Sequence, residues 1–341
     1  MNCKIIYLDT RSGYRSRLHS DTLWGAICWA IRMIYSTQKL EDFIAAYQPG
    51  GNHSDAIYIS SAFPYAMYAG ERVHFLPRIY KSVPAHEPLD DDIPFQQKKE
   101  AFRSLKKFKK RTWMTLHDFE REIGAIKPKE LPENHLSTIP SVKSVAVTHN
   151  TINRVTGATL ELNNGGQLFH IEENYVTIKD KNNQSLDTGL YFLAKGNVEL
   201  LEAALRFLQH HGIGGDKSIG KGAFQMTCKD FELQEPQDFN AQVTLSLYHP
   251  TEAERMNYQQ QQSPLMNYKL VERHGFIHNK YNKKIAKNPT LFFTEGSVLP
   301  NISGHSSDIF GENREIGKGK SVGHPVWRYG HGFMVKAKIP E

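Results

Sequence analysis

Five glycines and two lysines stand close together in residues 211–224, which read HGIGGDKSIGKGAF. Glycines at this density let the backbone adopt positive φ angles and approach a ligand closely. Consecutive N–H groups in such a loop can form a concave site for an anion, and lysines add positive charge to it. The loop is therefore suited to holding phosphate groups. Its candidate contacts are Gly214, Gly215, Lys217, Ser218 and Lys221.

Two familiar nucleotide-binding motifs fail in this loop. A Walker A motif needs a Ser or Thr after its lysine to hold Mg²⁺, and Gly222 stands at that position. A dinucleotide fingerprint needs a third glycine where Lys217 stands. The loop also lies between an apolar helical pattern over residues 198–208 and a strand-like run over residues 223–228, the reverse of a P-loop. A glycine-rich turn that only joins helix to strand is the structural alternative.

A second set of basic residues precedes a predicted helix near the N-terminus. Residues 3–8 are predicted to form a strand, and an apolar helix is predicted from Ser20 onward. Ser20 suits the N-cap position, and Asp21 in the first turn suits the helix dipole. A helix N-terminus that follows a basic loop is also a phosphate site. The candidates here are Arg15, Arg17, His19 and Ser20.

A third candidate region is a predicted β-hairpin. Residues 149–158 read HNTINRVTGA, and after an Asn/Gly turn at residues 163–166 a β-prone run follows over residues 168–173. Two such runs joined by Asn and Gly are typical of a hairpin. Arg154 is the best candidate there for a phosphate or base contact, with Asn153 beside it.

The rest of the chain alternates between predicted strands and helices. Further strands are expected over residues 58–65, 73–78 and 191–194, a helix over 198–210, and, in a second unit starting near Glu235, strands over 243–250, 268–273 and 290–295. Glycines and lysines again lead into a strand in residues 317–333, which suggests one architecture used twice.

Two charged segments lie between the predicted strands of the first unit. Three carboxylates at residues 90–92 could suggest a metal site, but prolines flank them and strand alternation would split them between two faces, which favours a solvated loop. Residues 98–111 are densely basic, with apolar residues at helical spacing. They are interpreted either as a solvated helix face or as a contact for RNA or an acidic partner.

Composition limits the class of protein. The chain has 341 residues and a formal net charge of +6, which allows two ordinary domains and indicates a polyanionic partner. No run of about 18 apolar residues is present, so no membrane span is expected. The absence of a signal-peptide pattern and three widely spaced cysteines indicate a cytoplasmic, reducing location, without a disulfide framework or a zinc site.

The order of these motifs resembles the RAMP proteins, the repeat-associated RNA-binding subunits of CRISPR systems. The glycine loop is similar to their G-h-G-G-x-x-x-x-G-x-G-x-F signature. Within that group, residues 18–23 (LHSDTL) and 325–333 (PVWRYGHGF) resemble the Csm-type fourth subunits of type III-A effector complexes. Residues 149–157 resemble that family's R-N-x-I-D-R-x-T-G segment, with His149 and Asn153 replacing arginine and aspartate.

The resemblance implies an α+β fold of two ferredoxin-like (RRM-like) domains with glycine-rich loops. Residues 1–232 would form the first, with a thumb-like β-hairpin, and residues 233–341 a less complete second domain. It also implies a non-catalytic subunit that binds the 5′ tag of crRNA, docks to the large Palm-domain subunit and caps a filament of the backbone RAMP subunit.

The competing interpretation is an enzyme. Some RAMP relatives are metal-independent endoribonucleases that process CRISPR repeat RNA with a histidine as general acid or base. His19 could be paired here with His149 or His210, although nothing in the sequence brings them together. We therefore expect a binding subunit with no catalytic residue, cofactor or metal.

Overall fold

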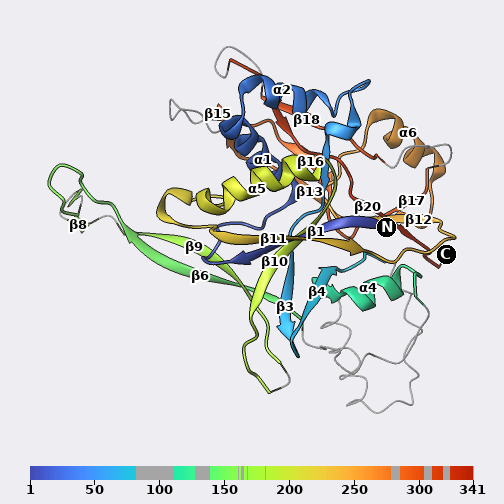
Figure 1. Cartoon of the computed structure of the whole chain (residues 1–341), viewed down its shortest axis with the longest axis horizontal. Helices are drawn as coiled ribbons and strands as arrows, with labels where there is room; N and C mark the ends of the chain where they lie inside the picture. The colour runs from blue at the N-terminus through green and yellow to red at the C-terminus, as the bar shows by residue number, and fades with distance from the viewer. Residues whose placement is uncertain are drawn as a thin grey trace.

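The computed structural model of the chain describes residues 1–81, 111–126, 139–159, 161–162, 165–166, 168–180, 182–277, 285–302, 309–317 and 323–340. The three carboxylates at residues 90–92, nearly all of the basic run over residues 98–111, and residues 318–322 of the second glycine-rich stretch lie outside these described residues. The fold is a mixed α/β arrangement of mostly antiparallel sheets with few helices (Figure 1).

The larger, N-terminal part of the chain, from β1 to β11 and called the first half below, forms a seven-stranded sheet. Its strands run in the order β11-β1-β10-β3-β4-β5, with β2 also paired to β10, and all neighbours are antiparallel. The strands are β1 (Asn2–Thr10), β2 (Ile57–Ile59), β3 (Phe63–Tyr68), β4 (Glu71–Pro77), β5 (Trp113–Thr115), β10 (Thr188–Gly196) and β11 (Phe224–Glu232).

Two helices pack on one face of this sheet. The helices α1 (Ser20–Ile34) and α5 (Val198–His211) contact each other, and the shorter α2 (Thr37–Ala45) packs against α1. Helix α5 begins where the Asn197 side chain accepts a hydrogen bond from the Leu200 N–H, an N-cap contact. Its apolar residues recur at helical spacing and are buried. The predicted helix over residues 198–210 is thus confirmed.

The second half of the chain packs against the other face. Its three-stranded sheet runs β17-β12-β20, and one core cluster joins Ile5, Tyr7 and Leu193 of the first sheet to Val243 and Val335 of the second. The elements of this half are β12 (Ala241–Thr244), α6 (Glu252–Gln261), β13 (Leu270–Arg273), β14 (Phe276–Ile277), β15 (Ile285–Ala286), β16 (Thr290–Phe293), β17 (Val298–Pro300), β18 (Arg314–Gly317), β19 (Val326–Arg328) and β20 (Met334–Ala337).

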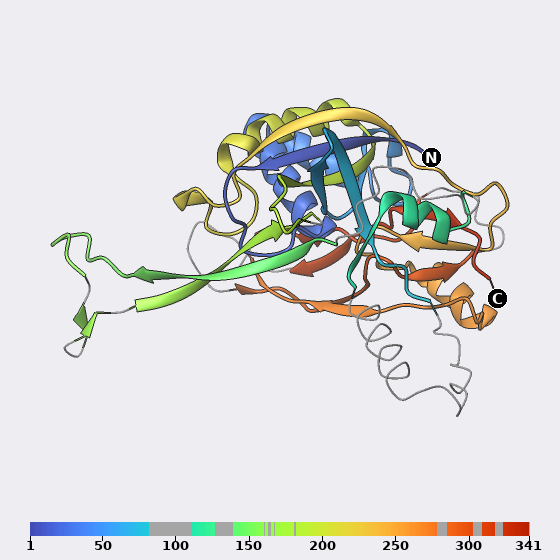
Figure 2. The same ribbon diagram turned by 90° about the horizontal axis from the view of Figure 1, so that it is seen from below.

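A long two-stranded hairpin extends away from the rest of the molecule (Figures 1 and 2). Strands β6 (Ser141–Asn150) and β9 (Leu168–Thr177) pair over ten residues each, and the short strands β7 (Glu161–Leu162) and β8 (Gly165–Gly166) lie beyond them. The predicted hairpin is therefore present. Residues 151–158, which were expected to continue a strand, instead form a turn closed by the Asn153 N–H bond to the Ala158 carbonyl.

Two other predicted strands are shorter than expected because side-chain hydroxyl groups form hydrogen bonds with backbone groups in place of strand pairing. The run over residues 58–65 breaks after Ile59, where the Ser60 hydroxyl accepts from the Leu193 N–H. The run over residues 243–250 stops at Thr244, whose hydroxyl accepts from the Ser246 N–H. Such local side-chain bonds compete with sheet pairing. The short helix α4 (Leu116–Glu122) covers β4 and β5.

In the described part of the chain, no helix is long and apolar enough to cross a membrane. The three cysteines are free thiols.

One buried and one partly buried histidine, His331 and His74, are expected to make the fold sensitive to acid. Burial lowers the pKa of His331 to about 4, and burial together with Arg72 lowers the pKa of His74 to about 4. Both values lie below the unfolded value near 6.5, so stability that is present above pH 6.5 is lost as the pH falls toward 4. Between pH 7 and pH 5 we expect each histidine to reduce the free energy of unfolding by about 2 kcal/mol, measured by urea denaturation.

The control for this pH dependence is His331→Phe, which keeps an aromatic ring but cannot be protonated. It is expected to remove about half of the pH-dependent loss of stability. An unchanged dependence in this variant would show that His331 does not contribute.

Candidate nucleic-acid interface

Three segments far apart in the sequence meet beside the glycine loop. The Gly222 N–H donates to the Gly13 carbonyl (3.0 Å), and the Ala223 N–H donates to the Ser12 hydroxyl (3.0 Å). At the base of the hairpin, Tyr14 and Asn174 exchange backbone hydrogen bonds of 3.2 and 2.8 Å. The glycine loop, the β1–α1 loop and strand β9 therefore form one junction.

Glycine is required where the two ends of the loop cross. The Ile213 N–H donates to the Gly222 carbonyl (3.0 Å), and a Cβ on Gly222 would lie 2.0 Å from the Ile213 carbonyl oxygen. Gly222 also has a φ of 69°, in the left-handed region that favours glycine. The crossing closes residues 212–222 into a compact loop.

The tip of the loop presents a row of free backbone N–H groups. Gly214 has a φ of 96° and Asp216 a left-handed φ of 58°, and the single 3₁₀ turn η2 (Lys217–Ile219) follows. Among the described residues, no acceptor meets the five successive N–H groups of residues 214–218. Such a row, at the start of a helical turn, is a site for an anion.

The two lysines of the loop have different surroundings. Lys217 is exposed and forms no ion pair within the described part of the chain. The Lys221 ammonium lies 2.5 Å from Glu173 Oε1, and the Tyr175 hydroxyl donates to the other oxygen (2.7 Å). Lys221 and Tyr175 hold the pKa of Glu173 below its ordinary value, and Glu173 raises the pKa of Lys221. Lys221 thus anchors the loop to the hairpin, while Lys217 stands free.

Arg15 is placed over the same loop. Its Nη1 lies 3.0 and 2.9 Å from the two Asp216 carboxylate oxygens, and a Cβ on Gly215 would lie 2.9 Å from the Arg15 side chain. The Asn174 side chain donates to the Arg15 carbonyl (2.9 Å). The Arg15 side chain is half exposed, and its charge beside the free N–H groups is balanced by the Asp216 carboxylate.

Arg17 and His19 lie at the seam between the two halves of the chain. His19 Nδ1–H donates to Glu295 Oε1 (2.7 Å), and Arg17 Nη2 lies 3.7 Å from Glu295 Oε2. The Ser61 hydroxyl also donates to the carboxylate. Burial raises the pKa of Glu295, but Arg17 and His19 outweigh it and hold that pKa well below its ordinary value. Arg17 also covers the Trp113 ring, 4.7 Å from its centroid.

Ser20 is a correction to the predicted site. It is fully buried, its hydroxyl accepts from the Leu247 N–H (3.0 Å), and it therefore cannot contact RNA in this structure. His19, without a side-chain cap bond, occupies the N-cap position predicted for Ser20. Asp21 accepts from Arg273 at 3.0 and 3.1 Å instead of only facing the helix dipole. The LHSDTL segment thus joins the two halves.

Asn153 and Arg154 lie at the tip of the hairpin, apart from the loop junction. The Asn153 carboxamide oxygen accepts from the Val155 N–H (2.9 Å), which fixes the turn and presents an exposed Arg154. Nearer the body, His149 stacks on Phe169 with ring centroids 5.6 Å apart. The half-exposed Phe169 offers a flat face on which a base could stack.

The histidines considered for catalysis have separate partners. His19 is bonded to Glu295, His149 stacks on Phe169, and His210 lies beside Gln209. Within the described residues none of the three contacts another, and no group of acidic, His or Cys side chains is arranged to hold a metal ion.

Comparison with known proteins gives the family. Residues 8–225 match the RAMP superfamily, and residues 237–337 match the CRISPR Csm4 C-terminal domain. The chain belongs to the RAMP superfamily. A curated relative of this RAMP protein, "CRISPR system Cms protein Csm4" of Thermococcus onnurineus (strain NA1), is 26% identical over 340 residues, 98% of this chain and 97% of the relative. The Csm4 of Methanocaldococcus jannaschii is 25% identical over 251 residues, 67% and 60% of the two chains.

Solved structures share the fold of this RAMP protein. The crystal structure of a Csm1–Csm4 cassette in complex with cA4 has a chain that matches with a TM-score of 0.60 at 23% identity, over the full length of both chains. A Csm3–Csm4 subcomplex of a type III-A CRISPR-Cas interference complex has a chain that matches with a TM-score of 0.53 at 17% identity, over 98% and 99% of the chains.

The sequence did not reveal three residues that shape the site of this RAMP protein. Asp216 holds Arg15, Glu173 holds Lys221, and Asn174 fastens the β1–α1 loop. Only Asp216, inside the glycine loop, carried a local signal. Glu173 and Asn174 acquire their roles from contacts with residues far away in the sequence.

Proposed function

We propose that this protein is a non-catalytic RNA-binding subunit of a type III-A CRISPR interference complex. In this proposal the glycine loop holds phosphates of the crRNA 5′ tag. The observation that carries it is the row of five free N–H groups at residues 214–218, which includes the exposed Lys217. A single-stranded RNA end is recognised by such groups on its phosphates, together with cations and aromatic faces for its bases.

The remaining predicted contacts follow the same chemistry. Arg15 lies over the loop, and the exposed Arg154 lies at the hairpin tip, so the hairpin would act as a thumb across the guide. Arg17 and His19 are only partly exposed and are engaged with Glu295. We assign them a supporting role rather than a primary phosphate contact.

The strand order supports ferredoxin-like domains. The order β11-β1-β10-β3, all antiparallel, with α1 after β1 and α5 after β10, corresponds to a β-α-β-β-α-β unit. We propose that residues 1–232 form this domain with its hairpin and that residues 233–341 form a less complete second one.

The partners follow from the relatives. Relatives with this fold are Csm4 chains in Csm1–Csm4 and Csm3–Csm4 complexes. We propose that this chain likewise docks to the large Palm-domain subunit, contacts a backbone RAMP subunit and works in the cytoplasm.

The test is fluorescence anisotropy of guide RNA with and without its 5′ tag, in the presence of the large subunit. Affinity is expected to depend on the tag and to fall in the Lys217→Ala/Arg154→Ala variant. Equal affinity for both RNAs, unchanged in the variant, would make the loop only a structural turn. Discrete cleavage of repeat RNA in EDTA, lost in His19→Ala, would contradict the non-catalytic assignment.

A single substitution tests the loop more narrowly. Lys217→Ala is expected to weaken binding of tagged RNA several-fold and to reduce the slope of log affinity against log salt by about one, the signature of one lost phosphate contact. Lys39→Ala, at an exposed position of α2, is the matched control and should leave the slope unchanged. Equal slopes in the two variants would exclude Lys217 as a phosphate contact.

A further inference from the structure

Strand β11 forms one edge of the seven-stranded sheet. It pairs with β1 along an unbroken register of nine residues, from Asn2 opposite Glu232 to Thr10 opposite Phe224. Among the described residues, no strand pairs with its other side. The edge is therefore a row of backbone groups on the surface, with the length of an ordinary strand.

The direction of the backbone groups follows from the two ends of the ladder. The Arg11 N–H donates to the Ala223 carbonyl (2.8 Å), and the Leu233 N–H donates to the Met1 carbonyl (3.0 Å). Because antiparallel pairing alternates, the odd-numbered residues of β11 face β1 and the even-numbered residues face outward. The outward set is Phe224, Met226, Cys228, Asp230 and Glu232. No described group is hydrogen-bonded to the backbone of this outward set.

The middle of this edge lacks the usual protection. Exposed edges are normally blunted by charges, prolines or bulges. Residues 225–228 of β11 carry no charge and no proline, and the register with β1 has no irregularity. Charged residues begin only at Lys229.

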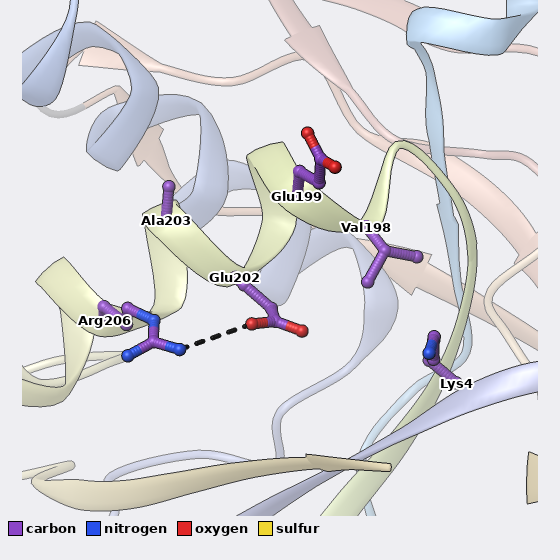
Figure 3. A pocket seen from close by; sticks show the side chains of 6 residues that line it. All are labelled: Lys4, Val198, Glu199, Glu202, Ala203 and Arg206. Carbon is purple, nitrogen blue, oxygen red and sulfur yellow. Dashed lines mark hydrogen bonds and ion pairs between the residues drawn. The ribbon is translucent and has the colours of Figure 1, made fainter. Parts of the chain in front are cut away.

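A groove lies beside α5 near this edge of the sheet, and Figure 3 shows its part between α5 and Lys4 of β1. One part, with a volume of about 520 Å³, is lined by Lys4, Val198, Glu199, Glu202, Ala203 and Arg206. A second part of about 230 Å³ shares Glu202 and Arg206 and reaches Met226, Thr227 and Cys228. The groove can take side chains from one face of a strand laid along β11.

The charge of this surface indicates which kind of chain fits it. Glu199 and Glu202 project from α5, and Asp230 and Glu232 lie at the end of β11. Two cations on this side are paired, Lys4 with Asp230 (2.7 Å) and Arg206 with Glu202 (3.5 Å), and the exposed Lys229 lies on the opposite face of the sheet because side chains alternate along a strand. Glu199 and Glu232 therefore keep their negative charge without a counter-charge among the described residues. This side of the edge is net negative, which favours a basic segment over RNA.

We propose that the β11 edge and its groove bind an extended, basic segment of a neighbouring protein subunit, which adds a strand to the sheet. Main-chain hydrogen bonds along the even-numbered residues would supply affinity, and alternate side chains in the groove would supply specificity. The inference rests on the proposed function, which makes this chain a subunit of a multi-protein complex. The surface is separate from the glycine loop and thus adds a second interface.

Hydrogen exchange with residue resolution tests the alternation directly. Amide exchange is measured for the full chain alone, with guide RNA alone, and with the large and backbone subunits added separately and together. The amides of Met226, Cys228 and Asp230 are expected to exchange fast in the free chain and about tenfold slower or more with a protein subunit. The odd-numbered amides should be slow throughout.

Three outcomes would overturn the proposal. The first is that the even-numbered amides still exchange fast in the assembled complex, and the second is that RNA alone slows their exchange. The third is that their exchange is already slow in the free chain because two copies pair through β11, which light scattering would show as a dimer. None of these outcomes depends on whether RNA binding requires the tag. A failure of this proposal can therefore be distinguished from a failure of the proposed function.

A proline substitution gives a second measurement. Cys228→Pro removes one outward N–H without taking a donor from the ladder with β1, and Cys228→Ala is the matched control. Subunit binding is expected to weaken by about tenfold in the proline variant, the equivalent of one lost hydrogen bond, and to be unchanged in the control. Affinity for tagged RNA should be the same in both. Equal subunit binding by the two variants would contradict strand addition, and denaturation curves verify that both are folded.

Discussion

Asp21→Asn is expected to lower the free energy of unfolding by about 3–5 kcal/mol, although it preserves the shape of the side chain. The Asp21 carboxylate accepts two hydrogen bonds from Arg273 and lies 3.8 Å from Arg328. The Arg328 side chain is 4% exposed, and burial lowers its pKa. Without the carboxylate, the buried Arg328 and the partly exposed Arg273 would share this region without a counter-charge.

The measurement is urea denaturation at pH 7, with Glu252→Gln as the control. Glu252 forms an exposed ion pair with Arg255 on α6, and exposed pairs contribute less than about 1 kcal/mol. If both variants lose the same small amount of stability, solvent screens the seam and Asp21 has no special role. If folded Asp21→Asn instead loses RNA affinity at unchanged stability, the LHSDTL segment acts on RNA after all.

Gly222→Ala is expected to distort the glycine loop and to abolish most of its affinity for tagged RNA. The new Cβ would lie 2.0 Å from the Ile213 carbonyl oxygen, a backbone atom that cannot move without opening the loop crossing. The left-handed backbone adds about 1–2 kcal/mol of strain. Loss of the free N–H row should reduce affinity by about tenfold or more, measured by anisotropy.

The Gly220→Ala variant is the control that separates the effect of backbone strain from that of a steric clash of the new Cβ. Gly220 has a similar φ of 82°, but a Cβ there would meet nothing within 4 Å. It should lose about 1 kcal/mol of stability through strain and retain RNA affinity. Equal RNA affinities for the two variants would contradict a role for the loop crossing.

Local patterns in the sequence predicted those parts of the fold that depend on near neighbours. Helix α5, the glycine loop and strand β11 follow each other as expected. Helical spacing, glycines and β-prone residues each determine the backbone conformation of residues only a few positions away. The hairpin was predicted for the same reason. Its ladder begins at Ser141, earlier than expected, since the polar residues of β6 carry a weak strand signal.

Local patterns failed where a residue's partner is distant. His19 and Ser20 suggested a phosphate site at a helix N-terminus, but Glu295 and Leu247, more than 220 residues away, occupy them. Within the glycine loop, the difference between Lys217 and Lys221 arises from Glu173 on the hairpin. No rule based on sequence spacing predicts such a contact, because the contact depends on how the two halves and the hairpin pack.

The hairpin separates its tip from the glycine loop by a defined span. Five residue steps lead from the Val145–Glu173 pair, beside Lys221, to the Asn150–Leu168 pair, about 17 Å at the usual rise of a strand. Arg154 lies beyond that pair. Under the proposed function, one nucleotide would be too short to touch both places, whereas a longer strand would contact both and gain avidity from two weak contacts at fixed separation. The hairpin would then make binding depend on the length of the RNA as well as on its charge.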